Sequence, residues 1–331
     1  MAIKVAVNGT GRIGIIAAKI VSQRADLELV AINTTAKSDM LEYLFKYDSV
    51  HKGVDAKVID DSTIEIAGKK VAMFRERDID KLDFGSAGAD VVLECTGVFT
   101  TTETAGKHLK GSVKKVVISA PAGDDTPTFV LNINTDEYNG EKVISNASCT
   151  TNCLAPIAKI LDDTFGIENG LMTTIHSYTN DQNILDVKHA KDMRRARAAA
   201  VNMIPTTTGA AKAIAKVMPS MKGKLNGYAM RVPTADVSVV DLTVNLKKSV
   251  TVEEINSAMS AGAEGNFKGL LEIDNDKRVS SDFIGSTYSA TYIPDMTSVV
   301  EGTTVKVLAW YDNEWGYTSR LIDMATFVGS N

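Results

Sequence analysis

The 331-residue chain has few cysteines, few aromatic residues and no excess of positive charge. Its three cysteines are too few for the disulfide framework of a small secreted domain. We see no stretch of about 20 apolar residues, so we expect neither a signal peptide nor a membrane helix, and a cytoplasmic location. The net charge of −5 and the isoelectric point near 5.5 argue against nucleic acid or an anionic membrane as the main partner.

Apolar residues make up 44% of the chain, which is enough for sizeable cores, and the length favours two domains. Strand-like and helical runs alternate in the first part. In the second part, alternating segments such as 238–245 and 305–311 indicate a mostly antiparallel sheet, with helices at 209–218 and 252–262 covering one face. We therefore expect an α/β protein, with a Rossmann-type dinucleotide-binding domain and an α+β catalytic domain.

A thiol occupies the predicted first turn of a helix, in the run Ser145-Asn146-Ala147-Ser148-Cys149-Thr150-Thr151-Asn152-Cys153. The N–H groups and the dipole at a helix start stabilise negative charge. We therefore expect Cys149 to be driven toward its ionised, nucleophilic form. A helix cap followed by a buried cysteine explains this segment alone equally well.

A histidine ends the apolar run that follows, in Thr173-Thr174-Ile175-His176-Ser177-Tyr178. A cysteine with a distant histidine is a pairing that serves covalent catalysis. A satisfied histidine at a strand end is the alternative, but the polar loop start at 177–182 favours the catalytic interpretation. Cys149 and Cys153 have no second pair of ligands at zinc spacing, so we expect no metal site.

The dinucleotide-binding fingerprint lies near the N-terminus. A β-rich run at 3–8 leads into Gly9-Thr10-Gly11-Arg12-Ile13-Gly14, an apolar-periodic helix follows, and a second strand at 27–33 completes the β-α-β unit. The glycines permit the tight turn and the close approach of the pyrophosphate to the helix N-terminus.

The carboxylate that usually reads the ribose 2′-hydroxyl is missing. It is expected at the end of the second strand, where this chain has Asn33 and Thr34. Without an acidic group the repulsion of a 2′-phosphate is lost, so NADP becomes acceptable. Alternatively, Asn33 or Thr34 simply binds the ribose of NAD.

Two further runs, 89–95 and 115–119, have the composition of buried parallel strands. Such strands bind ligands at their carboxyl ends, here near Thr96, Gly97 and Ser119. Short β segments between residues 57 and 74 indicate an inserted antiparallel patch.

A lone arginine, Arg231, lies inside an otherwise apolar strand. A buried guanidinium needs an anion, and with neighbouring hydroxyl and N–H donors it suits phosphate. The cluster Arg194-Arg195-Ala196-Arg197 is explained equally well by a solvated helix face.

These residues closely resemble the phosphorylating glyceraldehyde-3-phosphate dehydrogenases of the bacterial type. The resemblance covers essentially the whole length and is carried most specifically by the nine-residue cysteine motif at 145–153. It implies an NAD(P)-binding domain at 1–148, a catalytic domain at 149–312 and a C-terminal helix at 313–331 that returns to the cofactor domain. It also implies a homotetramer.

The resemblance also implies the roles of individual residues. Cys149 attacks the aldehyde, and His176 accepts the proton. Hydride then passes to NAD or NADP, which leaves a thioester. Inorganic phosphate attacks this thioester and releases 1,3-bisphosphoglycerate. The substrate phosphate and the attacking phosphate are expected at Ser148, Thr150, Thr179, Arg195, Thr208, Gly209 and Arg231. From the motif and the resemblance together, cofactor contacts are expected at Gly9, Gly11, Arg12, Ile13, Gly14, Asn33, Thr34, Arg77, Thr96, Gly97, Ser119, Lys188 and Asn313.

The chain departs from the common family pattern at a few positions. Thr10 and Ile15 are interpreted as tolerated packing changes. Thr34 replaces the usual acidic residue, and Lys188 replaces a proline in a loop that, in the family's tetramer, reaches a neighbour's adenosine. Thr34 and Lys188 together favour use of both NAD and NADP.

Two other functions are weaker alternatives. The first is the same chemistry on erythrose 4-phosphate, which Tyr178-Thr179 and Thr206-Thr207-Thr208-Gly209 disfavour because they match the triose-phosphate members. The second is a catalytically silent binding role, which would require the loss of Cys149 or His176. Both residues are present.

Overall fold

The computed structural model describes residues 2–331, with Lys212 described by its backbone alone. The chain divides into two compact units. The first unit consists of two segments, the residues up to Ser148 and Thr318–Asn331. The second unit is Cys149–Tyr317.

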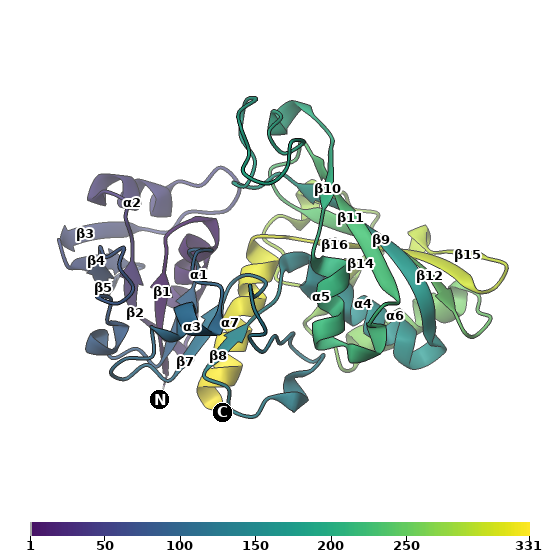
Figure 1. The fold of residues 1–331 in the computed structure, drawn as a ribbon, viewed down its shortest axis with the longest axis horizontal. Coiled ribbons are helices and arrows are strands. Elements are labelled where there is room, and N and C mark those ends of the chain that lie inside the picture. The colour runs from purple at the N-terminus through teal and green to yellow at the C-terminus, as the bar shows by residue number, and fades with distance from the viewer. Residues whose placement is uncertain (1) are drawn as a thin grey trace. The chain divides into compact units, whose positions relative to one another are not determined.

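The first unit is built on an eight-stranded sheet in the order β3-β4-β5-β2-β1-β6-β7-β8 (Figure 1). Its strands are β1 (Ile3–Asn8), β2 (Leu27–Asn33), β3 (Ala56–Asp60), β4 (Thr63–Ile66), β5 (Lys69–Phe74), β6 (Val91–Glu94), β7 (Lys115–Ile118) and β8 (Val143–Ser145). From β5 to β8 all pairs are parallel, whereas β3, β4 and β5 pair antiparallel. The predicted Rossmann-type sheet and its antiparallel patch are confirmed.

Buried apolar side chains explain why these runs form central strands. Val5 and Val7 of β1 and Leu93 of β6 are fully buried in a core with residues of α1 (Arg12–Gln23). Such strands, covered on both faces, are typical of parallel sheets. Shorter helices are α2 (Ser38–Lys46) and α3 (Thr102–Gly106).

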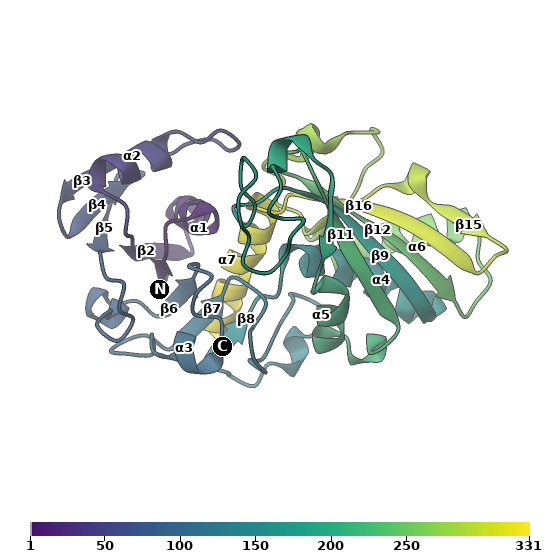
Figure 2. The ribbon, with the colours of Figure 1, turned by 45° about the horizontal axis from the view of Figure 1, so that its top comes forward.

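The C-terminal helix α7 (Trp315–Ser330) contributes to this same core. Its residues Leu321, Ile322 and Val328 are buried with β1 and α1 residues, and Phe327 packs edge-on against Tyr138. Figures 1 and 2 show the yellow helix alongside β7 and β8. The end of the chain therefore belongs to the first unit.

The second unit holds a mostly antiparallel sheet in the order β10-β11-β9-β12-β16-β14-β13, with β15 paired to β16. Its strands are β9 (Ile167–Ser177), β10 (Ile204–Thr207), β11 (Leu225–Val232), β12 (Ser238–Leu246), β13 (Leu271–Ile273), β14 (Ala290–Tyr292), β15 (Ser298–Val300) and β16 (Thr304–Tyr311). Its helices are α4 (Cys149–Phe165), α5 (Ala210–Val217) and α6 (Val252–Glu264). Short 3-10 helices of both units are η1 (Phe84–Ala87), η2 (Thr135–Glu137), η3 (Ala199–Val201), η4 (Pro219–Met221), η5 (Ser280–Phe283) and η6 (Pro294–Met296).

The sheet of the second unit places three functional strands side by side. The long strand β9 pairs parallel with β11 and antiparallel with β12, so that Arg231 lies opposite His176 and Val239 lies opposite Ile175. Helix α4 contacts β9, β12 and β16. The first residue of α4 is thereby held near the end of β9.

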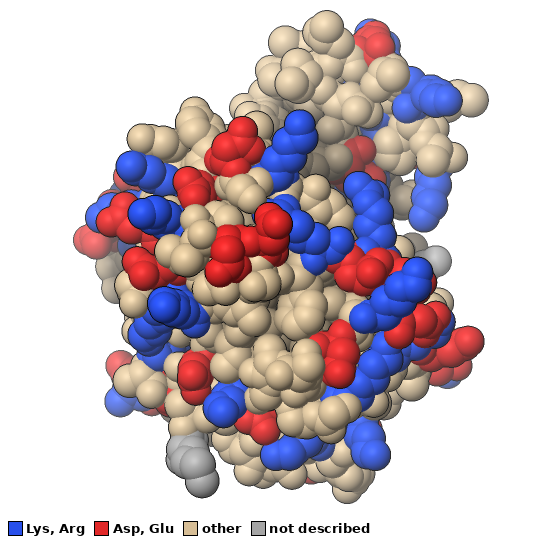
Figure 3. All heavy atoms as spheres, turned by 90° about the vertical axis from the view of Figure 1, so that its left-hand side faces the viewer, with Lys and Arg blue, Asp and Glu red and all other residues tan. Residues whose placement is uncertain are grey.

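On the face of the first unit that Figure 3 presents, acidic and basic side chains are interspersed. Within residues 2–331, no helix is both long and apolar enough to span a membrane.

Candidate active site

The thiol of Cys149 is at the first residue of α4, as the sequence predicts. The chain reaches it through a tight turn after β8. Ala147 in this turn has a φ of 56°, a left-handed conformation that is uncommon for alanine. The Ser145 hydroxyl accepts the Ala147 N–H at 3.1 Å and donates to the Ala120 carbonyl at 2.7 Å. These bonds hold the strained turn in place.

Cys149 and His176 lie in contact although 27 residues separate them. The Sγ atom is 3.6 Å from Nε2 of the imidazole. Only 4% of His176 is exposed, and Nδ1, its other ring nitrogen, lies 2.7 Å from the Ser177 carbonyl oxygen. In the tautomer with hydrogen on Nδ1, that nitrogen donates to the carbonyl and Nε2 can accept the thiol proton.

Arg231 supplies a cation beside this pair. Its Nη1 donates to the Ser177 carbonyl at 3.0 Å and lies 2.9 Å from His176 Nδ1 and 3.5 Å from the Thr179 hydroxyl. The pairing of β11 with β9 makes this approach possible. The structure therefore brings together four of the predicted residues: Cys149, His176, Thr179 and Arg231.

Burial and nearby charge act in opposite directions on the ionisation of the Cys149 thiol. Burial raises the pKa of the Cys149 thiol, while the Arg231 charge and the Thr150 hydrogen bonds act to lower it. Burial, and then the Arg231 charge, lower the pKa of His176 to about 3. These shifts favour a thiol beside a neutral imidazole, whereas the N–H groups at the start of α4 favour a thiolate, so the thiolate expected from the sequence stays a prediction.

Tyr311 is a member of the site that the sequence motifs do not single out. Its hydroxyl lies 2.8 Å from both the Thr150 and the Thr174 hydroxyls, and its ring packs edge-on against His176. Through this contact the Thr150 hydroxyl joins α4 to β16, and the expected place of Thr150 in an anion site stays a prediction. A tyrosine in an otherwise apolar strand end was the available signal.

Asn313 is held by two serine hydroxyls. Its Oδ1 accepts from Ser177 at 2.9 Å and from Ser238 at 2.7 Å. Ser238 also accepts the Ser177 N–H at 3.1 Å. Val237, just before Ser238, has a φ of 66°, which is an outlier for a β-branched residue and indicates strain at a functional position. Among the described residues no hydrogen bond uses the Asn313 Nδ2, so this donor can serve a ligand.

The remaining predicted anion-binding residues are more dispersed. The Arg195 guanidinium donates to the Thr206 hydroxyl at 2.8 Å and the Thr207 carbonyl at 3.0 Å, and it pairs with Asp181. Thr208 and Gly209 lie at the start of α5, where Gly209 is the N-cap residue. Ser148 is half-buried immediately before Cys149.

The glycine turn of the first unit has the shape that a pyrophosphate needs. Gly9 has a φ of 97°, and a Cβ at Gly14 would lie 1.8 Å from the Gly9 carbonyl oxygen, so both positions exclude larger residues. A Cβ at Gly11 would instead meet no atom within 4 Å. The open space at Gly11 lies at the N-terminus of α1, beside the half-buried Arg12 and Ile13.

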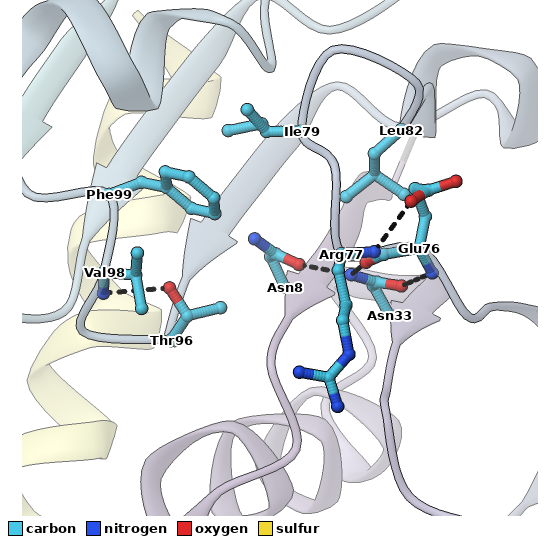
Figure 4. A pocket seen from close by; sticks show the side chains of 9 residues that line it. All are labelled: Asn8, Asn33, Glu76, Arg77, Ile79, Leu82, Thr96, Val98 and Phe99. Carbon is cyan, nitrogen blue, oxygen red and sulfur yellow. Dashed lines mark hydrogen bonds between the residues drawn. The ribbon is translucent and has the colours of Figure 1, made fainter.

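A cavity of about 190 Å³ lies at the carboxyl ends of β1, β2 and β6 (Figure 4). Its apolar wall is formed by Ile79, Leu82, Val98 and Phe99, and its polar lining by Asn8, Asn33, Glu76, Arg77 and Thr96. Flat apolar walls with a few amide groups suit a purine ring. Asn33, Arg77 and Thr96 were predicted from the sequence, and the other six were missed.

The side chain of Asn33 makes three hydrogen bonds within the protein. Its Nδ2 donates to Asn8 Oδ1 and to the Glu76 carbonyl, both at 2.8 Å, and its Oδ1 accepts the Glu76 N–H at 2.9 Å. Asn33 therefore shapes the cavity, and the second lone pair of its Oδ1 can still accept from a ribose hydroxyl, so its role as a ribose ligand stays a prediction.

Behind this cavity, Glu94 is the centre of a buried polar network. One carboxylate oxygen, Oε2, accepts from Asn8 at 2.6 Å and lies 2.9 Å from His108 Nε2, and the other accepts the Thr96 N–H at 2.8 Å. Glu94 and His108 are each 1% exposed. The network holds the start of the Thr96-Gly97 loop against the end of β1.

Other predicted cofactor residues lie at the same sheet edge or elsewhere. Gly97 has a φ of 71° in the exposed loop after β6, and Ser119 follows β7 with its N–H donated to the Glu94 carbonyl. Thr34 is buried directly after β2. Lys188 is exposed in a loop of the second unit.

A dinucleotide-binding sheet and a half-buried cysteine in contact with a buried histidine define a class of protein, the nicotinamide-dependent dehydrogenases that react through sulfur. Two family models match the chain. The NAD binding domain of glyceraldehyde 3-phosphate dehydrogenase matches residues 3–102, and the C-terminal domain of the same enzyme matches residues 148–313.

Full-length relatives agree with these matches. Glyceraldehyde-3-phosphate dehydrogenase of Geobacillus stearothermophilus is 53% identical over 333 residues, covering 100% of this chain and 99% of the relative. Glyceraldehyde-3-phosphate dehydrogenase 1 of Bacillus subtilis is 51% identical, and the match covers 99% of this chain and 98% of the relative. A cytosolic enzyme of the same name from Zea mays is 49% identical, with the same coverage. The chain belongs to the glyceraldehyde-3-phosphate dehydrogenase family of oxidoreductases.

Proposed function

We propose that this chain catalyses the NAD(P)-dependent phosphorylating oxidation of D-glyceraldehyde 3-phosphate to 1,3-bisphosphoglycerate. The observation that carries the proposal is the contact of Cys149 Sγ with Nε2 of the buried His176, beside the Arg231 guanidinium. A neutral imidazole can take the thiol proton at the moment of attack, so a resting thiolate is not required.

The first step forms a bond between Sγ of Cys149 and the aldehyde carbon. The sulfur proton passes to His176 Nε2, and the carbonyl oxygen becomes negative. The Cys149 N–H, at the first residue of α4, and the newly formed imidazolium are proposed to stabilise this oxyanion. The imidazolium then gives its proton to this oxygen, which leaves a thiohemiacetal bound to Cys149 beside a neutral His176.

The second step is an oxidation, for which the nicotinamide of NAD or NADP supplies the hydride acceptor. The thiohemiacetal hydroxyl returns its proton to His176 while hydride leaves the carbon, so that a thioester remains on Cys149. Asn313 is suited to hold the nicotinamide amide, because its Oδ1 is fixed by Ser177 and Ser238 and its Nδ2 can donate. Inorganic phosphate then attacks the thioester carbon, the C–S bond breaks, 1,3-bisphosphoglycerate leaves, and the His176 imidazolium returns its proton to the sulfur of Cys149.

Anion binding is assigned to the residues around Arg231. Its guanidinium is half-buried, and Thr179 presents a hydroxyl 3.5 Å from Nη1. Arg195 provides a second cation, whose charge acts on His176. Ser148, Thr208 and Gly209 complete the set of donors proposed for the substrate phosphate and the attacking phosphate.

Cofactor use is proposed to extend to both NAD and NADP. The first unit offers Gly11 for the pyrophosphate and the Phe99 cavity for adenine. No acidic side chain follows β2, because Thr34 stands there. Lys188 is proposed to lie near a 2′-phosphate bound by a neighbouring subunit.

The active assembly is proposed to be a homotetramer. Apolar side chains of the segment 184–203 are strongly exposed in the single chain, with Met193 at 92%. Others of this group are Ile184, Leu185, Val201 and Met203. Exposed apolar patches of this kind mark interfaces. Light scattering tests the proposal, and a fully active monomer would contradict it.

Steady-state kinetics tests the proposed reaction. Each cofactor is combined with glyceraldehyde 3-phosphate or erythrose 4-phosphate, with and without inorganic phosphate. We expect kcat/KM to be highest for the triose phosphate, and turnover to require phosphate. A preference for erythrose 4-phosphate would replace the proposed substrate.

A further inference from the structure

Two threonines lie in contact at the carboxyl ends of β1 and β2, where a Rossmann-type domain binds the ribose of its nucleotide. Thr10 lies between Gly9 and Gly11, and Thr34 follows β2 directly. Because β1 and β2 run parallel, with Asn8 opposite Asn33, both residues lie at the carboxyl ends of their strands. Their Oγ1 atoms are 2.6 Å apart.

Counting hydrogens gives this contact a direction. The Ala36 N–H donates to Thr34 Oγ1 at 3.1 Å, which uses one lone pair. If Thr10 also donated to Thr34, the Thr34 hydroxyl hydrogen would need another acceptor, and none is found for it among residues 2–331. If Thr34 donates to Thr10, every hydrogen at Thr34 is used. The second arrangement avoids a buried, unsatisfied donor.

Exposure leads to the same assignment. Thr34 is 1% exposed, whereas Thr10 is half-buried. With Thr34 donating, the Thr10 hydroxyl keeps its own hydrogen and one lone pair. The group that can reach a ligand is therefore on the glycine turn and not at the end of β2, where the usual carboxylate would be.

We propose that the Thr10 hydroxyl contacts the 2′ substituent of the adenosine ribose and determines cofactor choice, with Thr34 as the residue that positions it. The proposal rests on the NAD(P)-dependent function above and names the residue responsible for its cofactor range. Thr10 is thus more than the tolerated packing change inferred from the sequence.

The chemistry of a neutral hydroxyl explains why both cofactors are accepted. As a donor it can bind the oxygen of a 2′-hydroxyl or of a 2′-phosphate, and it carries no charge that repels the phosphate. A hydrogen bond to a charged group is stronger than a hydrogen bond between two neutral groups. Loss of the Thr10 hydroxyl should therefore weaken NADP binding more than NAD binding.

The test is calorimetric titration of NAD and NADP into the assembled full-length protein and three variants. Thr10→Val removes the hydroxyl at nearly constant volume, Thr10→Ser keeps it, and Thr34→Val removes only the positioning partner. In Thr10→Val we expect the ratio of Kd for NADP to Kd for NAD to rise at least about threefold. Thr10→Ser should stay within about twofold of the parent, and Thr34→Val should fall between the parent and Thr10→Val. Thermal unfolding confirms that each variant is folded.

Several results would overturn the assignment. These are an unchanged ratio in Thr10→Val, a larger change in Thr34→Val than in Thr10→Val, or a parent chain that does not bind NADP. The titration contains no aldehyde and therefore measures dinucleotide binding alone. A failure of the proposed reaction would be seen in a separate assay, as missing turnover by a protein that still binds both dinucleotides.

Discussion

Arg231 and His176 lie opposite each other on adjacent strands, with Nη1 of the guanidinium 2.9 Å from Nδ1 of the imidazole. The cation disfavours a protonated imidazole and favours a negative sulfur on the other side of the ring. One residue of β11 therefore acts on both partners of the reacting pair. This relationship has consequences that can be measured.

Replacement of Arg231 should make the thiol harder to ionise. The guanidinium lowers the pKa of Cys149 against the larger effect of burial, so Arg231→Met should move the pH profile of iodoacetamide alkylation to higher pH. At a fixed pH below the pKa, the thiolate fraction falls about tenfold for each whole number by which the pKa rises, and alkylation slows with it. Arg231→Lys keeps the charge and should move the profile less. An unchanged profile in Arg231→Met would remove the guanidinium from this role.

Arg231 should also distinguish phosphorylated from unphosphorylated aldehydes. Arg231→Lys loses the paired donors of the guanidinium but keeps a cation. We expect kcat/KM for glyceraldehyde 3-phosphate to fall about tenfold or more, with a much smaller change for glyceraldehyde. Equal losses for both aldehydes would show that Arg231 is structural.

His176→Asn should lower kcat by about 10²–10⁴-fold, the usual contribution of a positioned acid–base group. Asparagine keeps a polar group in the site but cannot exchange a proton. Stopped-flow measurement of the first turnover reports the step directly. Hydride transfer at the parental rate would show that another group accepts the Cys149 proton.

The same substitution should change how stability depends on pH. Folded His176 stays neutral to about pH 3, whereas the unfolded imidazole takes a proton near 6.5. The unfolded chain therefore binds more protons in this range, and the free energy of unfolding falls as the pH drops from 6.5 toward 3.

Between about pH 5.5 and 4 this contribution is at most about 1.4 kcal/mol per pH unit. Urea unfolding at fixed protein concentration should give a correspondingly flatter pH dependence for His176→Asn than for the parent. Parallel curves would mean that the folded imidazole titrates normally.

The parts of the structure that the sequence predicts are those encoded in contiguous residues. The run 3–14 contains its own strand, turn and helix start, and 145–153 contains the strand end and helix start that present Cys149. Two residues whose roles depend on partners distant in sequence, Tyr311 and Asn8, were missed. Tyr311 reaches Thr150 across 161 residues, and Asn8 reaches Glu94 across 86. Sequence order carries no signal for such pairs.

The ionisation state of the Cys149 thiol could not be predicted from the sequence either. A helix start is readable from a motif, and its field favours a thiolate. The depth of burial that opposes this field depends on strands β9, β12 and β16 packed against α4. The direction in which the Cys149 pKa moves could be obtained only after these elements were placed.

A carboxylate at the end of β2 should restrict the cofactor. Thr34→Asp places a negative charge at a buried position next to Thr10, where it repels a 2′-phosphate. We expect kcat/KM for NADP to fall at least about tenfold relative to NAD. Thr34→Asn, which is similar in size and neutral, is the matched control. A similar loss in both variants would indicate a packing effect and not charge.

A covalent thioester at Cys149 is the central intermediate of the proposed reaction. Rapid mixing of the protein with glyceraldehyde 3-phosphate and NAD, without inorganic phosphate, should produce a burst of about one NADH per subunit, followed by near-arrest. Phosphate added afterwards should restart turnover, and mass spectrometry should find the acyl group on the peptide that contains Cys149. Cys149→Ser should show neither burst nor adduct. Continuous turnover without phosphate, or a full burst in Cys149→Ser, would contradict the proposed chemistry.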